Sequence, residues 1–325
     1  NRIVWAWSTS DVIAYHGAKR GTNIITFFGS ASSSALPTYD GSWIVQMQGY
    51  TIPNQVTTYA CQSYAFPTDR DRHIVAIRPI NVSSYNHHAI VHICQNNSYF
   101  DQHASPQLCS YHPTGSVPGT SISPSGGKGS SPLGELEAGC SGLIWSWAVG
   151  MGDVIFPDAA GFRTGSGAIS NIILEVHYDN PSLEAGVVDN IGFEAFYVEN
   201  TLRPYDAASI IVGDPIVTFG DITNGLVPQE TGNLPKETAI IHREATCPSA
   251  CTQDFTSSIN VFAHFLHMHH YGHKIYTEKY SSTGEYQGIA GNRIDFWDNG
   301  FQQMQPVNYT VAPGDSLQTH CYYDT

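Results

Sequence analysis

The chain has 325 residues, a formal net charge of −14 and only 13% charged residues, against a usual share of about 25%. Its 14 lysines and arginines are scattered, so a nucleic-acid partner, which requires clustered basic residues, is not expected. No apolar run approaches the roughly 20 residues that cross a bilayer, and the first residues lack a signal peptide's pattern, so we expect no membrane span in this chain.

Short strands joined by turns are indicated for nearly the whole chain. Its 30 glycines and 18 prolines suit frequent turns, and helical spacing of apolar residues over a dozen positions is absent. Short β-branched and aromatic runs recur instead, as in residues 72–80, 171–179 and 258–269. These runs predict an all-β protein. Because 325 residues exceed the usual size of one hydrophobic core, we expect two domains.

Composition also indicates where these domains begin and end. Residues 29–42 are small, polar and turn-forming, which predicts a linker after an opening segment at residues 1–28. The strand pattern breaks at an Arg-Pro pair a few residues after position 200. We therefore expect one domain at residues 43–200 and a second at residues 201–325.

Residues 81–100 contain an unusual group of histidines. His87 and His88 are adjacent in a run whose alternation predicts a strand, with His92 on the same face as His88. Neighbouring strand residues point to opposite faces. The two imidazoles therefore reach one metal ion only if the backbone bends, or if one ring binds through Nδ1 and the other through Nε2.

Two later strands add further histidines. His177 ends a predicted strand at residues 171–179, and His267 and His269 share one face of a predicted strand at residues 258–269, a geometry that can chelate a metal. A lone strand-end histidine is more often a polar surface residue than a ligand. Three imidazole groups with few carboxylates or thiolates nearby favour copper or zinc over calcium or magnesium, and spacing alone does not choose between those two.

Cysteines and glycosylation sequons indicate the compartment. Three sequons begin at Asn81, Asn96 and Asn308, and the chain has seven cysteines. Together they favour a glycoprotein with disulfides that is secreted or lies in the lumen of secretory vesicles. Because seven is odd, at least one cysteine has no partner within the chain.

Five motifs, in this order, carry a resemblance to a known family: TTYACQ, YNHHAIVHIC, ILEVHYDNP, VFAHFLHMHHYGHK and VAPGDSLQTHCYYDT. They resemble the type II, ascorbate-dependent copper monooxygenases, the family of dopamine β-hydroxylase and peptidylglycine α-hydroxylating monooxygenase. The resemblance covers residues 43–325. Residues 1–28 resemble the last strands of a DOMON domain, the β-sandwich that precedes the catalytic core in dopamine β-hydroxylase relatives.

The resemblance implies two jelly-roll-type β-sandwich domains, each with one copper ion, preceded by a fragment of a DOMON β-sandwich. Five histidines match the family's ligands, three for the electron-transfer copper and two for the catalytic copper: His87, His88 and His177, and His267 and His269. In the family a methionine completes the catalytic set and lies past the motif that ends here at Thr325. Met268 does not match it and is expected to point away from the two catalytic histidines.

The resemblance also implies disulfide pairings. Cys61 would pair with Cys109, and Cys94 with Cys140. The other three cysteines match family cysteines whose partners lie further downstream: Cys247, Cys251 and Cys321. An alternative is a bridge between the first two of these across the short CPSAC loop.

On this basis we expect an enzyme that hydroxylates an activated C–H bond of a small molecule with O2, two copper ions and ascorbate as reductant. Copper held by neutral imidazoles and a thioether can cycle between Cu(I) and Cu(II). Peptide-amidating members of the family have an arginine two positions before the HxH pair, where this chain has Phe265. This difference argues against a peptidylglycine substrate and leaves a small amine as the expected one.

Two other interpretations remain open. An extracellular structural glycoprotein or fibre subunit would keep the fold without catalysis, and its open sandwich edges would pair with other copies in a homo-oligomer. A zinc hydrolase is disfavoured because no glutamate stands beside the HxH pair as a general base. The remaining histidines are expected at the surface or behind the ligands, among them His92, His103, His242, His273 and His320.

Overall fold

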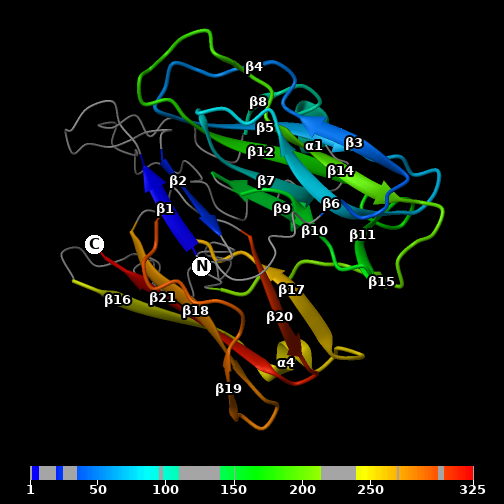
Figure 1. Cartoon of the computed structure of the whole chain (residues 1–325), viewed down its shortest axis with the longest axis vertical. Coiled ribbons are helices and arrows are strands. Elements are labelled where there is room, and N and C mark those ends of the chain that lie inside the picture. Colours follow the sequence, from blue (N-terminus) through cyan, green and yellow to red (C-terminus); the bar gives the residue numbers. More distant parts are fainter. Residues whose placement is uncertain are drawn as a thin grey trace. The chain divides into compact units, whose positions relative to one another are not determined.

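A computed structural model shows the described ranges as β-sheets, antiparallel except where β15 pairs with β11, and two short helices (Figure 1). The structure describes residues 2–6, 20–24, 35–94, 98–109, 140–149, 151–213, 239–268, 271–298 and 304–324. None of the helices in these ranges has the length and hydropathy needed to cross a bilayer. The all-β fold class predicted from the sequence is confirmed.

The chain divides into two compact units. The first comprises Asn1–Gly129 and Ala138–Ser209, and the second comprises Ser130–Glu137 and Ile210–Thr325. The DOMON assignment concerns residues 1–28, of which only the backbone of the β1–β2 pair is described, so it stays a prediction. These two strands are β1 (Arg2–Ala6) and β2 (Arg20–Ile24).

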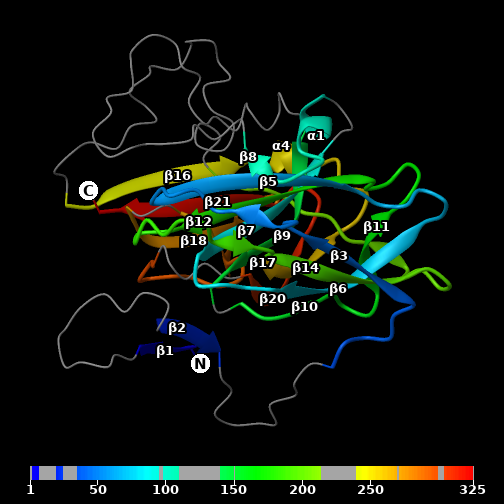
Figure 2. The ribbon, with the colours of Figure 1, turned by 90° about the horizontal axis from the view of Figure 1, so that it is seen from above.

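The first unit contains two larger sheets, which Figure 2 shows edge-on as layers. One has the order β15-β11-β6-β14-β3 with β10 also paired to β6, and the other has the order β8-β5-β12-β7-β9. The strands of the first sheet are β3 (Gly41–Gln46), β6 (Arg72–Ile80), β10 (Val154–Ile155), β11 (Ala160–Thr164), β14 (Gly192–Val198) and β15 (Tyr205–Asp206). The strands of the second are β5 (Thr57–Ala65), β7 (Asn86–Cys94), β8 (Gln107–Leu108), β9 (Cys140–Ala148) and β12 (Asn171–Asp179). Beside them lie β4 (Tyr50–Thr51), its partner β13 (Val188–Asp189) and helix α1 (Ser98–Gln102).

Alternation along β12 determines what lies on each side of the second sheet. Ile172, Leu174 and Val176 are fully buried on its inner face. The ring of Trp145 on β9 packs against that of Phe193 on β14, with centroids 5.2 Å apart, so the two sheets share this core. The odd-numbered residues of β12 therefore project from the outer face, which is where the histidines lie.

In its described residues, the second unit has a four-stranded sheet, a two-stranded ribbon and one short helix. The sheet has the order β16-β21-β18-β19. Its elements are β16 (Ile241–Cys247), α4 (Ser249–Thr252), β17 (Ile259–His264), β18 (Gly272–Tyr280), β19 (Tyr286–Ile289), β20 (Gln305–Val311) and β21 (Ser316–Tyr323). Val311 of β20 and Leu317 of β21 are buried in one apolar cluster, which Val261 of β17 also contacts. The ribbon and the sheet are thus joined by a common core.

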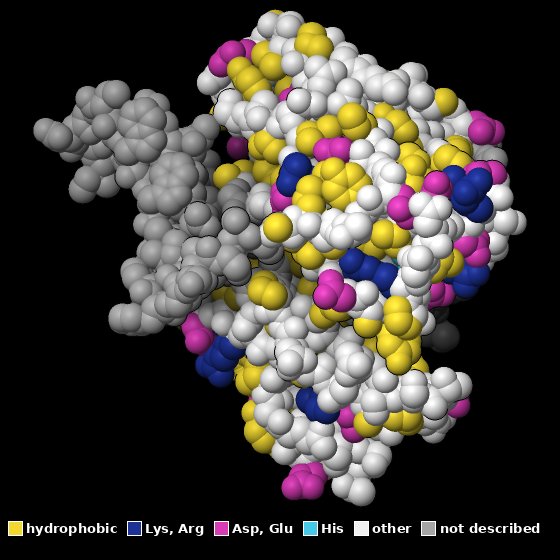
Figure 3. All heavy atoms as spheres, turned by 45° about the vertical axis from the view of Figure 1, so that its right-hand side comes forward, with side chains coloured by type: hydrophobic (Ala, Val, Ile, Leu, Met, Phe, Trp, Pro, Cys, Tyr) yellow, Lys and Arg dark blue, Asp and Glu magenta, His cyan; other side chains and the backbone are white. Residues whose placement is uncertain are grey.

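Charged side chains are dispersed over the face of the molecule in Figure 3, where basic and acidic groups lie near one another. Several form pairs within the first unit. Arg78 contacts Asp153 at 2.9 Å, and Arg72 contacts Asp69 at 2.8 Å. The surface therefore carries mixed charge rather than a single basic patch on the face shown.

Candidate metal centre

Three of the predicted ligands meet where β7 and β12 pair. His177 lies opposite His88 in the register, whereas Tyr178 lies opposite Asn86, so His87 is the extra residue of a β-bulge. The Nδ1 atom of His87 lies 3.1 Å from Nδ1 of His88 and 3.1 Å from Nδ1 of His177. The backbone bend that two adjacent ligands require is therefore present. All three rings offer Nδ1, so a mixed use of Nδ1 and Nε2 is not needed.

The separations of these nitrogens fit one metal ion. Imidazole nitrogens at about 2.0–2.1 Å from a tetrahedral ion lie roughly 3.3 Å from one another. The ligand atoms of His87, His88 and His177 all lie within 4.8 Å of one another, and two of the pairs are at 3.1 Å. The three side chains are half-buried, so the site faces solvent on one side. An all-imidazole set of this kind suits copper or zinc.

Tyr59 supports the ring of His177 from the neighbouring strand. The two residues lie opposite each other on β5 and β12, and their rings stack with centroids 4.3 Å apart and planes inclined by 18°. Burial, together with the negative charge of Glu175, raises the pKa of the Tyr59 phenol to about 12. The phenol therefore stays protonated at neutral pH and acts as an uncharged packing surface for the imidazole. No sequence pattern marked Tyr59 as part of the site.

A buried polar pair lies next to the three histidines on the same face of the sheet. The Nε2 atom of His92 is 3.3 Å from Oε2 of Glu175, and the two side chains are only 4% and 3% exposed. The expected alternatives for His92 were a surface position or one behind the ligands, and its burial excludes the first. Glu175 was missed, although its position two residues before His177 placed it on the ligand face.

One disulfide covers the outer face of the same sheet. Cys61 and Cys109 are bonded, which confirms that predicted pairing, and both pack against Ile173. Cys94 is also disulfide-bonded, and its backbone lies in register with Cys140. The side chain of Cys140 lies outside the described residues, so the second pairing stays a prediction.

Cys247 and Cys251 are not joined to each other, so the alternative bridge across the CPSAC loop is wrong for this structure. Burial, and a hydrogen bond with the thiol of Cys251, raise the pKa of Cys247 to about 11. The Cys247 thiol is therefore protonated at neutral pH, a state of low reactivity.

The second predicted ligand pair is described only in part. Strand β17 ends at His264, opposite Gln305 where the partner strand β20 begins, so it is shorter than the strand expected through residue 269. His267 lies beyond the strand end and is exposed, and His269 lies outside the described residues. Met268 is 3% exposed and packs in an apolar cluster, whereas His267 is exposed. Because His269 is not described, the expected orientation of Met268 away from the histidine pair stays a prediction.

The remaining expected sites have mixed outcomes. A surface position is wrong for His103 and His320, which are 1% and 6% exposed. Two of the sequon asparagines are exposed, Asn81 and Asn308, and Asn96 lies outside the described residues.

Comparison with known proteins links these sites to a family. Residues 43–185 match the family model of the copper type II ascorbate-dependent monooxygenase, N-terminal domain. Residues 220–325 match the family model of the C-terminal domain of the same enzymes. DBH-like monooxygenase protein 1 of Homo sapiens is 30% identical over 340 residues, which cover 100% of this chain and 50% of the relative. Tyramine beta-hydroxylase of Caenorhabditis briggsae is 31% identical, covering 84% of this chain and 42% of the relative. Dopamine beta-hydroxylase of Equus caballus is 28% identical, covering 91% and 44%. The chain thus spans about half the length of the curated relatives it matches.

Proposed function

Because the chain belongs to the copper type II ascorbate-dependent monooxygenase family, we propose that it hydroxylates an activated C–H bond of a small amine with O2 and ascorbate. The observation that carries this proposal is the convergence of three Nδ1 atoms at the β7 bulge. The proposed ligands of one copper are His87, His88 and His177, and those of the second include His267 and His269. The family match supports copper as the resident metal where donor chemistry alone leaves zinc as an alternative.

When bound, copper supplies one-electron redox chemistry and oxygen activation, with ascorbate as the source of electrons. The chain's own residues hold the imidazoles in place for it. The bulge turns His87 toward the ligand cluster, and stacking on Tyr59 orients His177. A neutral imidazole that binds a metal through Nδ1 would carry its proton on Nε2.

The proposed substrate class rests on two observations. Two of the reported relatives are named for their action on amines, tyramine and dopamine. Phe265 stands two positions before His267, where an arginine would be expected in a member that grips a peptide carboxylate. An aromatic side chain at this position favours a substrate with an apolar body over a carboxylate.

We also propose that the protein is a glycoprotein that works outside the cytosol, as a secreted protein or in the lumen of secretory vesicles. The Cys61–Cys109 disulfide supports this compartment, since such bonds persist where the environment is oxidising. Exposure of Asn81 and Asn308 makes both sequons accessible to glycosylation.

The test is metal analysis and turnover of the full-length protein from a secretory expression host. We expect about two copper ions per chain, and O2-dependent and ascorbate-dependent hydroxylation of tyramine or dopamine. His87→Ala should lose one copper and the activity. His273→Ala, which replaces a half-buried histidine outside the proposed sites, should keep both. Occupancy by zinc alone, or full copper retention in His87→Ala, would contradict the proposal.

A further inference from the structure

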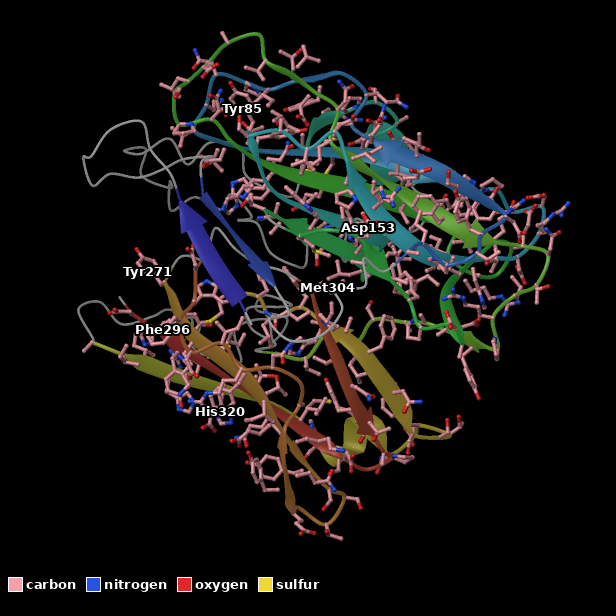
Figure 4. All side chains as sticks on the ribbon, in the orientation of Figure 1. Tyr85, Asp153, Tyr271, Phe296, Met304 and His320 are labelled. Carbon is pink, nitrogen blue, oxygen red and sulfur yellow. A yellow bond between two sulfur atoms is a disulfide. The ribbon has the colours of Figure 1, made fainter. Side chains whose placement is uncertain are left out.

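A second cluster of metal-ligating side chains lies in the other unit, on the sheet β16-β21-β18. His242 and Glu244 project from β16 and His320 projects from β21, where it is labelled in Figure 4. Nε2 of His242 lies 3.0 Å from Nδ1 of His320. Oε1 of Glu244 lies 3.6 Å from the first of these nitrogens and 3.4 Å from the second. Three potential ligand atoms therefore form a small triangle.

Strand register brings these residues together. Glu244 lies opposite His320, and His242 lies opposite Tyr322, so all four side chains share one face of the sheet. The ring centroids of the two histidines are 5.1 Å apart, farther than their closest nitrogens, so these nitrogens face each other. His242 and Glu244 are 34% and 47% exposed, whereas the imidazole of His320 is 8% exposed. The triangle is thus anchored in the sheet and open to solvent.

Neighbouring groups orient two of the three potential ligands. Gln318 donates a hydrogen bond of 2.8 Å to Oε2 of Glu244, which leaves Oε1 directed to the histidines. Nε2 of His320 lies 3.3 Å from Oε2 of Glu278 and has no aligned hydrogen bond. A small rotation of the Glu278 carboxylate would let it accept a hydrogen bond from Nε2 of His320, which would hold the proton there and leave Nδ1 as a ligand atom. Tyr280 in turn donates a 2.6 Å hydrogen bond to Glu278.

We propose that His242, Glu244 and His320 form a metal site that is separate from the proposed copper ligands and binds a divalent ion, Zn2+ or Cu2+. Two imidazoles and one carboxylate are a ligand set that such borderline ions accept. Ligand atoms of a tetrahedral ion of this kind lie about 3.3 Å apart, and the observed sides are 3.0, 3.4 and 3.6 Å. Exposure of the triangle leaves a fourth position for water. None of these residues belongs to the proposed copper sites, so this inference stands independently of the proposed function.

The two nearby cationic side chains, Lys274 and Arg293, contact groups other than the three potential ligands. Lys274 and Arg293 lie over tyrosine rings of the same sheet, at 4.6 Å from the Tyr322 centroid and 4.7 Å from the Tyr276 centroid. Both cations also contact the carboxylate of Asp295, at 3.9 and 2.7 Å. Glu244 and Glu278 therefore leave local negative charge for a cation at the triangle.

The experiment is a Zn2+ titration of the full chain against a chromophoric chelator, which counts the ions bound and measures their affinity. Glu244→Gln and His242→Gln replace exposed side chains and should each bind one Zn2+ fewer than the unsubstituted chain. Glu285→Gln, at an exposed turn in the same unit, is the matched control and should bind the full number. Equal numbers and affinities in all four proteins would overturn the proposal.

Three further measurements test whether this site is separate from the copper sites, what Glu278 does and which ion binds more tightly. Combining Glu244→Gln with His87→Ala should remove two ions, because the losses are independent; a combined loss of one ion would overturn the separation. Glu278→Gln should weaken Zn2+ binding at this site by about 10- to 100-fold while Co2+ still shows a tetrahedral spectrum. Unchanged affinity would contradict the positioning role of Glu278. Repeating the titration with Cu2+, read by electron paramagnetic resonance, identifies which of the two ions binds more tightly.

Discussion

The ring of Tyr59 lies flat against the ring of His177, with the centroids 4.3 Å apart, on adjacent strands of the sheet that carries three proposed copper ligands. The Tyr59 ring thus orients the proposed ligand His177 by stacking on it. Because its pKa is raised to about 12, the phenol contributes packing rather than charge at neutral pH.

Replacing this aromatic surface should loosen the copper site. We expect Tyr59→Leu to weaken copper binding by about 10- to 100-fold, the usual effect of losing a group that orients a ligand. Tyr59→Phe keeps the stacking ring and should bind copper as the unsubstituted chain does. Copper affinity by competitive titration checks both, and equal weakening in the two variants would show that the hydroxyl, not the ring, matters.

The buried pair of His92 and Glu175 should be sensitive to loss of one partner. Glu175→Gln removes the carboxylate beside the buried imidazole of His92, which should cost about 1–3 kcal/mol of unfolding free energy. Replacing both residues by leucine should cost less, because no polar group is left alone. Urea denaturation measures this, with exposed Glu184→Gln as control. If Glu175→Gln lowers the free energy of unfolding no more than Glu184→Gln does, the His92–Glu175 contact does not contribute to stability.

The Cys61–Cys109 disulfide closes a loop with a sequence separation of 48 residues. Loop-closure entropy for this length predicts a stabilisation of about 4 kcal/mol. The double variant Cys61→Ala/Cys109→Ala should therefore unfold at markedly lower denaturant concentration. A reducing agent should lower the stability of the unsubstituted chain and have a smaller effect on the variant. Equal sensitivity of both proteins to reductant would contradict this contribution.

Asp69 is expected to contribute to the free energy of unfolding, and this contribution should be lost in acid. Its hydrogen bonds with the guanidinium of Arg72 lower the pKa of the Asp69 carboxyl from 3.8 to about 2. Because the pKa is lower in the folded state, this contribution is present above about pH 4 and is lost as pH falls toward 2. Asp69→Asn should therefore show a shallower fall of stability over this interval.

The measurement is unfolding free energy against pH for the unsubstituted chain, for Asp69→Asn and for Asp101→Asn. Asp101 is an exposed aspartate outside this ion pair and serves as the control. Curves of the same slope for Asp69→Asn and the unsubstituted chain would show that the Arg72 contact does not contribute.

Much of the candidate site could be predicted from residues close together in the sequence. A short β-branched run in residues 72–80 and alternation in residues 171–179 predicted strands that the structure contains as β6 and β12. The same alternation placed His177 and Glu175 on one face, although only the first was recognised as important. Five ordered motifs pointed to the family that the comparisons show.

The bulge at His87 was not predictable in the same way. Whether two adjacent imidazoles face one point depends on a single extra residue in the pairing of β7 with β12, and a shift of one residue reverses every side chain. The shorter β17 has a similar origin, since its length is limited by where β20 begins.

The sequence by itself determined the period-two patterns, the identities of the ligand candidates and the family, because these depend on local alternation and ordered motifs. Only the tertiary structure decided which distant side chains meet. His242 and His320 are 78 residues apart, and they come within 3.0 Å because β16 and β21 pair in one register. Strand pairing is a long-range interaction, so no local pattern in either segment predicts the contact.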